Sequence, residues 1–216
     1  MAKVLSIDFE QPEARTEAVQ NIRSVLKSGG VIAFPTDTFY GLGADPFNPE
    51  AVSRIFQIKQ RPADKPLLAL IHSIDQITTL TDQVTPLTQF LMAQFWPGPL
   101  TLLLKAAPGL PGELTAGTGK VGVRLPAHLF TLQLLEALDC PLTAPSANLS
   151  GRGELSTAVE VVQVLGAQLD LIVDGGPAPG GKPSTVLDAT TDPPTLFREG
   201  AVSRAELESL LPIQDG

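Results

Sequence analysis

The chain has 216 residues, of which 43% are hydrophobic and 18% are charged. This composition excludes a disordered chain, because enough apolar surface is available to offset the entropy of ordering, and it excludes a coiled coil, which needs more charge. The formal net charge is −8, and residues 131–216 hold 4 Lys or Arg against 12 Asp or Glu, which argues against nucleic-acid binding by that part.

Cysteine and histidine are scarce in this sequence. One cysteine, Cys140, and two histidines exclude a disulfide framework and a metal site built on several such ligands. Cys140 lies in an apolar stretch before Pro141, which favours a buried structural thiol over a nucleophile. The first ten residues carry three charges without a long apolar core, and no apolar run is long enough to span a membrane. We therefore expect a soluble, cytoplasmic protein.

Residue spacing predicts alternating strands and helices along the first half of the chain. Apolar runs predict strands, and apolar residues three or four positions apart predict helices. Two of the helices are expected to begin with a polar cap followed by proline, at Asn48-Pro49 and Thr85-Pro86. The expected strands span residues 4–9, 31–34, 67–71, 100–104 and 121–125, and a further helix spans residues 12–26.

The second half continues this alternation. Thr157 with Glu160 forms a capping-box pattern before a helix, and Ser203 with Glu206 is expected to cap the last helix. A helix is expected over residues 129–138, and strands over 142–144, 171–173, 184–187 and 195–197, the last two as an antiparallel pair. With no internal repeat and no linker, the sequence predicts one α/β domain over residues 1–216. We expect it to be a twisted mixed β-sheet flanked by helices.

The segment from Gly176 to Lys182 has the glycine and lysine spacing of a phosphate-binding loop. However, Pro183 stands where Ser or Thr should follow the lysine. Pro177 and Pro179 also lack the backbone N–H groups that such a loop uses to hold phosphate. The residues that follow predict a strand and not a helix. A lid or hinge loop is therefore the preferred interpretation.

Three polar segments follow predicted elements and are candidates for ligand binding. Residues 35–43 and 143–151 are rich in small hydroxyl residues and glycine and lie at the ends of short strands, where open α/β sheets bind ligands. Residues 59–66 contain three cations and two prolines after a helix. Arginine offers a fork for phosphate oxygens and lysine a point charge. An ordinary turn remains the alternative interpretation of residues 35–43, and a solvated helix end remains the alternative interpretation of residues 59–66.

Two arginines lie in predicted strands. Arg124 is surrounded by apolar residues, and Arg198 ends another strand. A buried arginine requires an anion, so each either pairs with a protein carboxylate or receives a substrate anion. Cations, hydroxyls and glycines at strand ends, without a nucleophile or a metal cluster, favour nucleotide or phosphate chemistry by positioning and charge stabilisation.

Seven segments of the chain carry a family resemblance when they are taken together. These segments are PTDTFYGLGAD (35–45), KQRPADKPL (59–67), WPGPLTLLLK (96–105), GVRLPAH (122–128), APSANLSG (144–151), PSTVLDA (183–189) and REG (198–200). Together they resemble the YrdC family of threonylcarbamoyl-AMP synthases, in its short, single-domain form. The segments occur in the family's order and cover most of the chain, and the ordered set is more specific than any one of them.

This resemblance implies an activity and a set of ligands. The family joins L-threonine, bicarbonate or CO2, and ATP into L-threonylcarbamoyl-AMP and pyrophosphate, with Mg2+ accompanying the ATP. Partner proteins then transfer the threonylcarbamoyl group to tRNA, and tRNA itself is a possible contact. The implied fold is a twisted α/β sheet with a concave, positively charged surface. No residue is assigned as a metal ligand.

The resemblance also assigns roles to residues of this chain, position by position. Catalysis is assigned to Lys59 and Arg61, which would face the triphosphate. The residues assigned to L-threonine are Thr38, Arg124, Ala144 and Ser184. The residues assigned to the nucleotide are Lys59, Arg61, Lys65, Ser146, Asn148 and Arg198. Lys120 and Glu154 are also placed near ATP.

The sequence departs from its relatives at Leu70, where some of them have a histidine that contacts threonine. His72 would point to the same face of a strand, two residues further on. Two alternatives stay open beside the synthase. One is a non-catalytic module that binds double-stranded RNA or tRNA. The other is a carbamoyl-transfer domain as in the hydrogenase maturation protein HypF, although the zinc-binding cysteines that accompany that domain are missing here.

Overall fold

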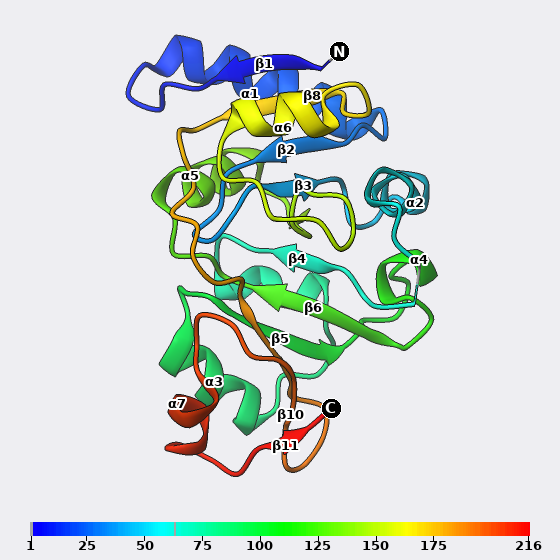
Figure 1. Cartoon of the computed structure of the whole chain (residues 1–216), viewed down its shortest axis with the longest axis vertical. Helices are drawn as coiled ribbons and strands as arrows, with labels where there is room; N and C mark the ends of the chain where they lie inside the picture. Colours follow the sequence, from blue (N-terminus) through cyan, green and yellow to red (C-terminus); the bar gives the residue numbers. More distant parts are fainter. Residues whose placement is uncertain (1, 63) are drawn as a thin grey trace.

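The strands of this protein form two mixed sheets that lie one above the other in Figure 1. The computed structural model describes residues 2–62 and 64–216. The first sheet has the order β1-β8-β2-β3, and the second has the order β11-β10-β9-β5-β6-β4-β7. The strands are β1 (Lys3–Ser6), β2 (Ile32–Phe34), β3 (Gly41–Gly43), β4 (Leu68–Leu70), β5 (Leu100–Lys105), β6 (Lys120–Arg124), β7 (Leu142–Thr143), β8 (Leu171–Asp174), β9 (Thr185–Asp188), β10 (Thr195–Arg198) and β11 (Gln214–Asp215).

Helices flank both sheets, and their predicted caps are present. Asn48 accepts hydrogen bonds from the amides of Glu50 and Ala51, and Thr157 and Glu160 form the complete capping box. The helices are α1 (Pro12–Lys27), α2 (Pro49–Lys59), α3 (Pro86–Phe95), α4 (Gly112–Thr115), α5 (Leu129–Leu138), α6 (Ala158–Leu165) and α7 (Arg204–Glu208), with a 3-10 helix at Ile74–Thr79. None of the helices in the described residues is long and apolar enough to cross a membrane.

The α/β class with mixed sheets and flanking helices is confirmed, but the single expected sheet is divided in two. The division falls between the edge strands β3 and β7. There the amide of Leu42 donates to the carbonyl of Pro145 at 2.8 Å, and the amide of Thr143 donates to the carbonyl of Ala44 at 3.0 Å. An isolated bridge also links Gly41 and Ser146. The two sheets therefore join through a few irregular hydrogen bonds in place of a regular ladder.

The structure contains elements that the sequence did not predict. Strand β3 lies inside the Gly-rich segment 35–43, where glycines hid the strand pattern, and β11, α4 and the 3-10 helix are too short to show a period. The phosphate-loop-like segment is followed by strand β9 and not by a helix, as predicted. Strands β9 and β10 pair antiparallel, also as predicted.

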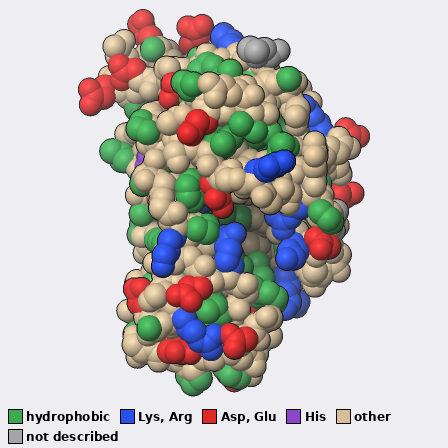
Figure 2. Space-filling model, in the orientation of Figure 1, with side chains coloured by type: hydrophobic (Ala, Val, Ile, Leu, Met, Phe, Trp, Pro, Cys, Tyr) green, Lys and Arg blue, Asp and Glu red, His purple; other side chains and the backbone are tan. Residues whose placement is uncertain are grey.

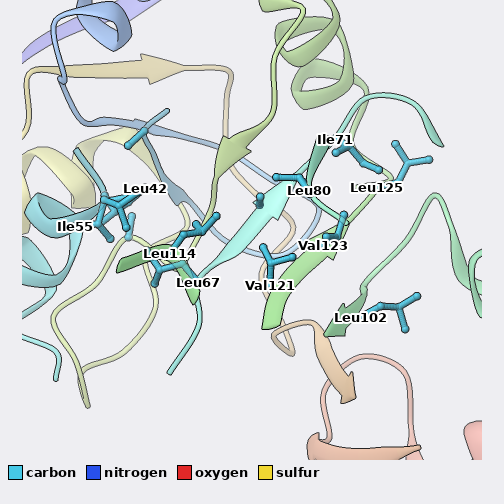
Figure 3. Close-up of a cluster of buried hydrophobic side chains, with 14 of the residues drawn as sticks. Leu42, Ile55, Leu67, Ile71, Leu80, Leu102, Leu114, Val121, Val123 and Leu125 are labelled. Atoms are coloured by element: carbon cyan, nitrogen blue, oxygen red, sulfur yellow. The ribbon is translucent and has the colours of Figure 1, made fainter. Parts of the chain in front are cut away.

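Alternation along the second sheet separates the main core from a hollow on the opposite face. On β6, Val121 and Val123 are fully buried in the core, whereas Lys120, Gly122 and Arg124 line a cavity. Figure 3 shows the core side chains, with Val121 and Val123 near Leu80 and Leu102. The same alternation recurs on β5, where Thr101 and Leu103 line the cavity. The two-residue period of strands thus builds core and cavity from one sequence.

Candidate active site

A cavity of about 590 Å³ lies on the face of the second sheet opposite the core. Strands β5, β6, β9 and β10 line it from the second sheet. The lining residues from the segment that leads into β3 are Thr36, Thr38, Phe39, Tyr40 and Gly41. Lys and Arg side chains surround a hollow midway down the molecule in Figure 2. Eight residues assigned from the sequence line this cavity, namely Thr38, Arg61, Lys65, Arg124, Ala144, Ser146, Ser184 and Arg198. Lys120 and Glu154 line it as well.

Arg124 ends β6 and is only 2% exposed. Its Nη1 donates to Asp37 Oδ1, and the other carboxylate oxygen of Asp37 accepts from the amide of Ala127 at 3.3 Å. The Nε of Arg124 is buried without a hydrogen-bond partner among the described residues. Of the two alternatives left by the sequence, the protein carboxylate is present. One buried donor of the guanidinium nevertheless has no acceptor, although buried polar groups normally have one.

Arg198 is held at the cavity by Ser184. Its Nη2 donates to the Ser184 carbonyl at 2.8 Å and to the Ser184 hydroxyl at 3.2 Å, and that hydroxyl lies 3.0 Å from the hydroxyl of Thr101. Arg198 reaches solvent, yet the protein atoms around its guanidinium lower its pKa. The charges of Arg124 and Arg61 lower the pKa of Arg198 further, while Glu154 opposes the shift. Three guanidinium groups therefore converge on this cavity.

Lys59 ends α2, and its ammonium is buried among oxygens of the 146–148 loop. The Nζ donates to the carbonyls of Ser146 and Asn148, the latter at 3.0 Å, and to the side-chain oxygen of Asn148 at 2.9 Å. Burial lowers the pKa of Lys59 to about 8, with a further contribution from Arg61. Neither Lys59 nor Asn148 lines the cavity. Their predicted contacts with the nucleotide stay predictions, and in this structure both residues hold the loop that presents Ser146.

Arg61 and Lys120 are positioned by different means. Arg61 follows α2, and its backbone amide donates to the carbonyl of Phe56 at 3.0 Å. Burial lowers the pKa of the Arg61 guanidinium, and Asp64 opposes that shift. Lys120 begins β6 and forms an ion pair of 2.6 Å with Asp188, which is 1% exposed. The charge of Lys120 is thus balanced by the protein.

The loop after β8 is tied to the segment that carries Thr38. The amide of Gly180 donates to the carbonyl of Thr38 at 2.7 Å, and the hydroxyl of Tyr40 donates to the carbonyl of Gly176 at 2.8 Å. Pro183, at the end of this loop, lines the cavity. The sequence predicted a lid here, and the structure shows a loop tethered next to Thr38.

Leu70 and His72, the two positions considered for the missing histidine contact with threonine, lie away from the cavity. Leu70 is fully buried in the second core cluster, and the Nε2 of His72 lies 3.6 Å from Asp139 Oδ1. Neither side chain lines the cavity.

Cys140 is half-buried, less deeply than expected. Burial, assisted by Asp45, raises the pKa of its thiol to about 11, which keeps it protonated and unreactive near neutral pH.

Sequence reasoning missed three contributors to the site. Asp37 was given no role except as the cap of a turn, in the alternative interpretation of residues 35–43, although a charged residue between two threonines after a buried strand could have marked it as the partner of a buried cation. Thr101 gave no signal, because threonine is common in strands. Phe197 gave none either, because an aromatic residue in a strand normally belongs to a core.

The family model Sua5_yciO_yrdC, described as "Telomere recombination", matches residues 24–200. The chain belongs to this family. It is 41% identical over 186 residues to a threonylcarbamoyl-AMP synthase of Pyrococcus abyssi, covering 86% of this chain and 55% of that protein. It is also 41% identical over 189 residues to a threonylcarbamoyl-AMP synthase of Bacillus subtilis, covering 87% of this chain and 55% of that protein.

A solved structure of the family agrees with this assignment. The crystal structure of P. abyssi Sua5 complexed with L-threonine matches this fold with a TM-score of 0.90 at 36% identity, covering 99% of this chain and 62% of that one. The chain therefore spans about half the length of the curated relatives named above, and less than two thirds of the solved structure.

The buried pair of Asp37 and Arg124 leads to a stability prediction. Asp37→Asn leaves a buried guanidinium without its carboxylate, which should lower the free energy of unfolding by about 3 kcal/mol. The matched control is Glu208→Gln, which makes the same change in the partly exposed pair with Arg204 and should cost less than about 1 kcal/mol. Urea denaturation measures both, and equal small losses would contradict the importance of the buried pair.

Lys59 leads to a pH-dependence prediction. Its pKa falls from 10.5 to about 8 on folding. Between these values the unfolded chain binds the proton and the folded protein does not, so the contribution of Lys59 to the free energy of unfolding rises with pH. The free energy of unfolding of wild type minus that of Lys59→Met, measured by urea denaturation, should therefore increase from pH 8 to pH 10.5. A constant difference for Lys59→Met would contradict the lowered pKa.

Proposed function

We propose that this protein makes L-threonylcarbamoyl-AMP and pyrophosphate from L-threonine, bicarbonate or CO2, and ATP. The observation that carries the proposal is the convergence of Arg61, Arg124 and Arg198 on one cavity that also presents small hydroxyls. A cavity of about 590 Å³ has the size of a small-molecule site. The named relatives, which are called threonylcarbamoyl-AMP synthases, support the same reaction.

The proposed reaction needs charge stabilisation and no protein nucleophile. The amine of threonine adds to CO2 and loses a proton, which gives a carbamate. A carbamate oxygen then bonds to the α-phosphorus of ATP, and the bond to the bridging oxygen breaks, so that pyrophosphate leaves. Both the carbamate and the mixed anhydride are labile in water. The site must therefore neutralise negative charge and exclude water, and fixed guanidinium groups in a sheltered cavity suit this task.

The arrangement of residues suggests where each substrate lies. We place threonine beside Thr38, Ala144 and Arg124, which line the cavity, because Asp37 leaves a donor of the Arg124 guanidinium without an acceptor. We place the triphosphate by Arg61, Lys65 and Arg198. Ser146 and Ser184 line the same cavity. A bound carboxylate beside Arg124 would complete the partners of its guanidinium.

Mg2+ is proposed to enter with ATP. Across residues 2–62 and 64–216 there is no group of three or more His, Cys, Asp or Glu that could hold a metal. Magnesium commonly uses one or two carboxylates together with substrate phosphates. Asp64 and Glu154 line the cavity near the cations and fit that pattern. Bound Mg2+ would neutralise charge on the triphosphate.

Partner proteins that transfer the threonylcarbamoyl group to tRNA are part of the proposal. The product is an unstable adenylate, so its use requires an acceptor enzyme, and a cytoplasmic location would bring the two together. The competing proposal is a non-catalytic RNA-binding module. The acidic composition of residues 131–216 argues against it, because RNA binding depends on contacts between cations and phosphates.

Pyrophosphate release tests the proposed activity. Purified protein with ATP and Mg2+ should release pyrophosphate only when L-threonine and bicarbonate are both present. Release without threonine, or no release from folded protein, would contradict the synthase. Salt-dependent RNA binding by such an inactive protein would favour the RNA-binding module instead.

Arg61→Ala should abolish this release while the protein stays folded. The variant removes a cation proposed to stabilise the leaving pyrophosphate, and losses of such electrostatic groups reduce kcat by about 100-fold or more. The control is Lys105→Ala, which removes an exposed cation that lies outside this cavity. Release by Arg61→Ala at the wild-type rate would exclude Arg61 from the phosphate site.

A further inference from the structure

Phe197 is an exposed aromatic side chain at the cavity, with 56% of its surface accessible. It lies on β10, directly before Arg198. Large apolar side chains are normally withdrawn from solvent in strands that cover a core, and the preceding residue, Leu196, is buried there. Phe197 contributes little to the core, so its place at a polar cavity calls for another explanation.

A bulge in β10 brings Phe197 and Arg198 to the same cavity. The pairing with β9 runs regularly from Thr195 to Leu196 and then shifts, so that Arg198 pairs with Val186. In a regular strand, two successive side chains point to opposite faces, and Arg198 would point toward the core. Because of the shift, both Phe197 and Arg198 line the cavity. Bulges of this kind re-aim side chains next to active sites.

The two side chains together offer a flat apolar surface beside a fixed cation. Arg198 is anchored on the carbonyl of Ser184, and the charges of Arg61 and Arg124 lie close enough to lower its pKa. Phosphates attracted to this cluster would place the other end of a nucleotide near Phe197. Phe39 also lines the cavity, but it is half-buried and next to Thr38, at the end assigned to threonine.

We propose that Phe197 is the platform on which the adenine base of ATP stacks. This inference rests on the proposed function and adds to it the residue that binds the base. Aromatic rings stack with bases through their faces, and removing such a ring weakens binding about 5- to 150-fold. The ring of Phe197 would therefore act on affinity for the nucleoside part, whereas Arg198 and Arg61 act on the phosphates.

The test compares Phe197→Ala with Phe197→Trp and with the control Phe90→Ala. Phe90 is 40% exposed on α3 and lies outside the cavity. For Phe197→Ala, the KM for ATP in pyrophosphate release should rise about fivefold or more, with the KM for L-threonine unchanged. Phe197→Trp should retain the wild-type KM for ATP because it keeps an aromatic face, and Phe90→Ala should behave as wild type.

Inhibitors separate the base from the phosphates. AMP should inhibit Phe197→Ala more weakly than wild type by the same factor, while inorganic tripolyphosphate should inhibit both equally. Equal KM values for ATP in wild type and Phe197→Ala would overturn the platform. Equal weakening of AMP and tripolyphosphate would overturn it as well, because the substitution would then have disturbed the phosphate site.

Equilibrium dialysis with AMP distinguishes failure of the platform from failure of the proposed function. This measurement needs no turnover. If wild type binds AMP and Phe197→Ala binds it more weakly, the platform is supported even where pyrophosphate release fails. If wild type and Phe197→Ala bind AMP equally, the proposed role of Phe197 is wrong, and the proposed synthase activity is then judged by pyrophosphate release alone. If wild type binds no AMP, the platform is overturned.

Discussion

The buried ion pair between Asp37 and Arg124 connects the two sheets at the site. Asp37 follows β2 of the first sheet, and Arg124 ends β6 of the second. Removing both charges from water is expensive, so a pair of this kind persists where geometry and further hydrogen bonds compensate. Asp37 accepts such a hydrogen bond from the amide of Ala127, whereas the Nε of Arg124 has no hydrogen-bond partner in the described residues. The pair thus joins the two sheets at the cavity and leaves one buried donor of Arg124 without an acceptor.

Arg198, a second cation of the site, is held by neutral oxygens, because it donates to the carbonyl and hydroxyl of Ser184. Lys59, which does not line the cavity, is held in the same way by two carbonyls and an amide oxygen. Neutral acceptors orient these groups without cancelling their charge. Among the described contacts, Lys120 differs, because Asp188 neutralises it. The result is a cavity with fixed positive charge inside a protein whose net charge is −8, which is the arrangement needed to stabilise a triphosphate and a leaving pyrophosphate.

Much of the fold could be predicted from local signals in the sequence. Caps such as Asn48 and Thr157 fixed the starts of helices, and apolar runs located most strands, because these signals act over a few residues. The division into two sheets could not be predicted, since it depends on how β3 and β7 meet in space. Eight of the cavity residues were named by resemblance and strand position, but the contacts of Lys59 with the 146–148 loop and the bulge at Phe197 depend on tertiary contacts and pairing register that no local pattern encodes.

The chemical identity of the product is the decisive measurement. The protein would be incubated with ATP, Mg2+, L-threonine and 13C-bicarbonate, quenched rapidly, and the adenylates analysed by mass spectrometry. The proposed reaction predicts an adenylate that contains threonine and one labelled carbon, heavier by one mass unit than the product formed from unlabelled bicarbonate. An adenylate without the label, or consumption of ATP with no adenylate of threonine, would contradict the proposed carbamate chemistry at this site.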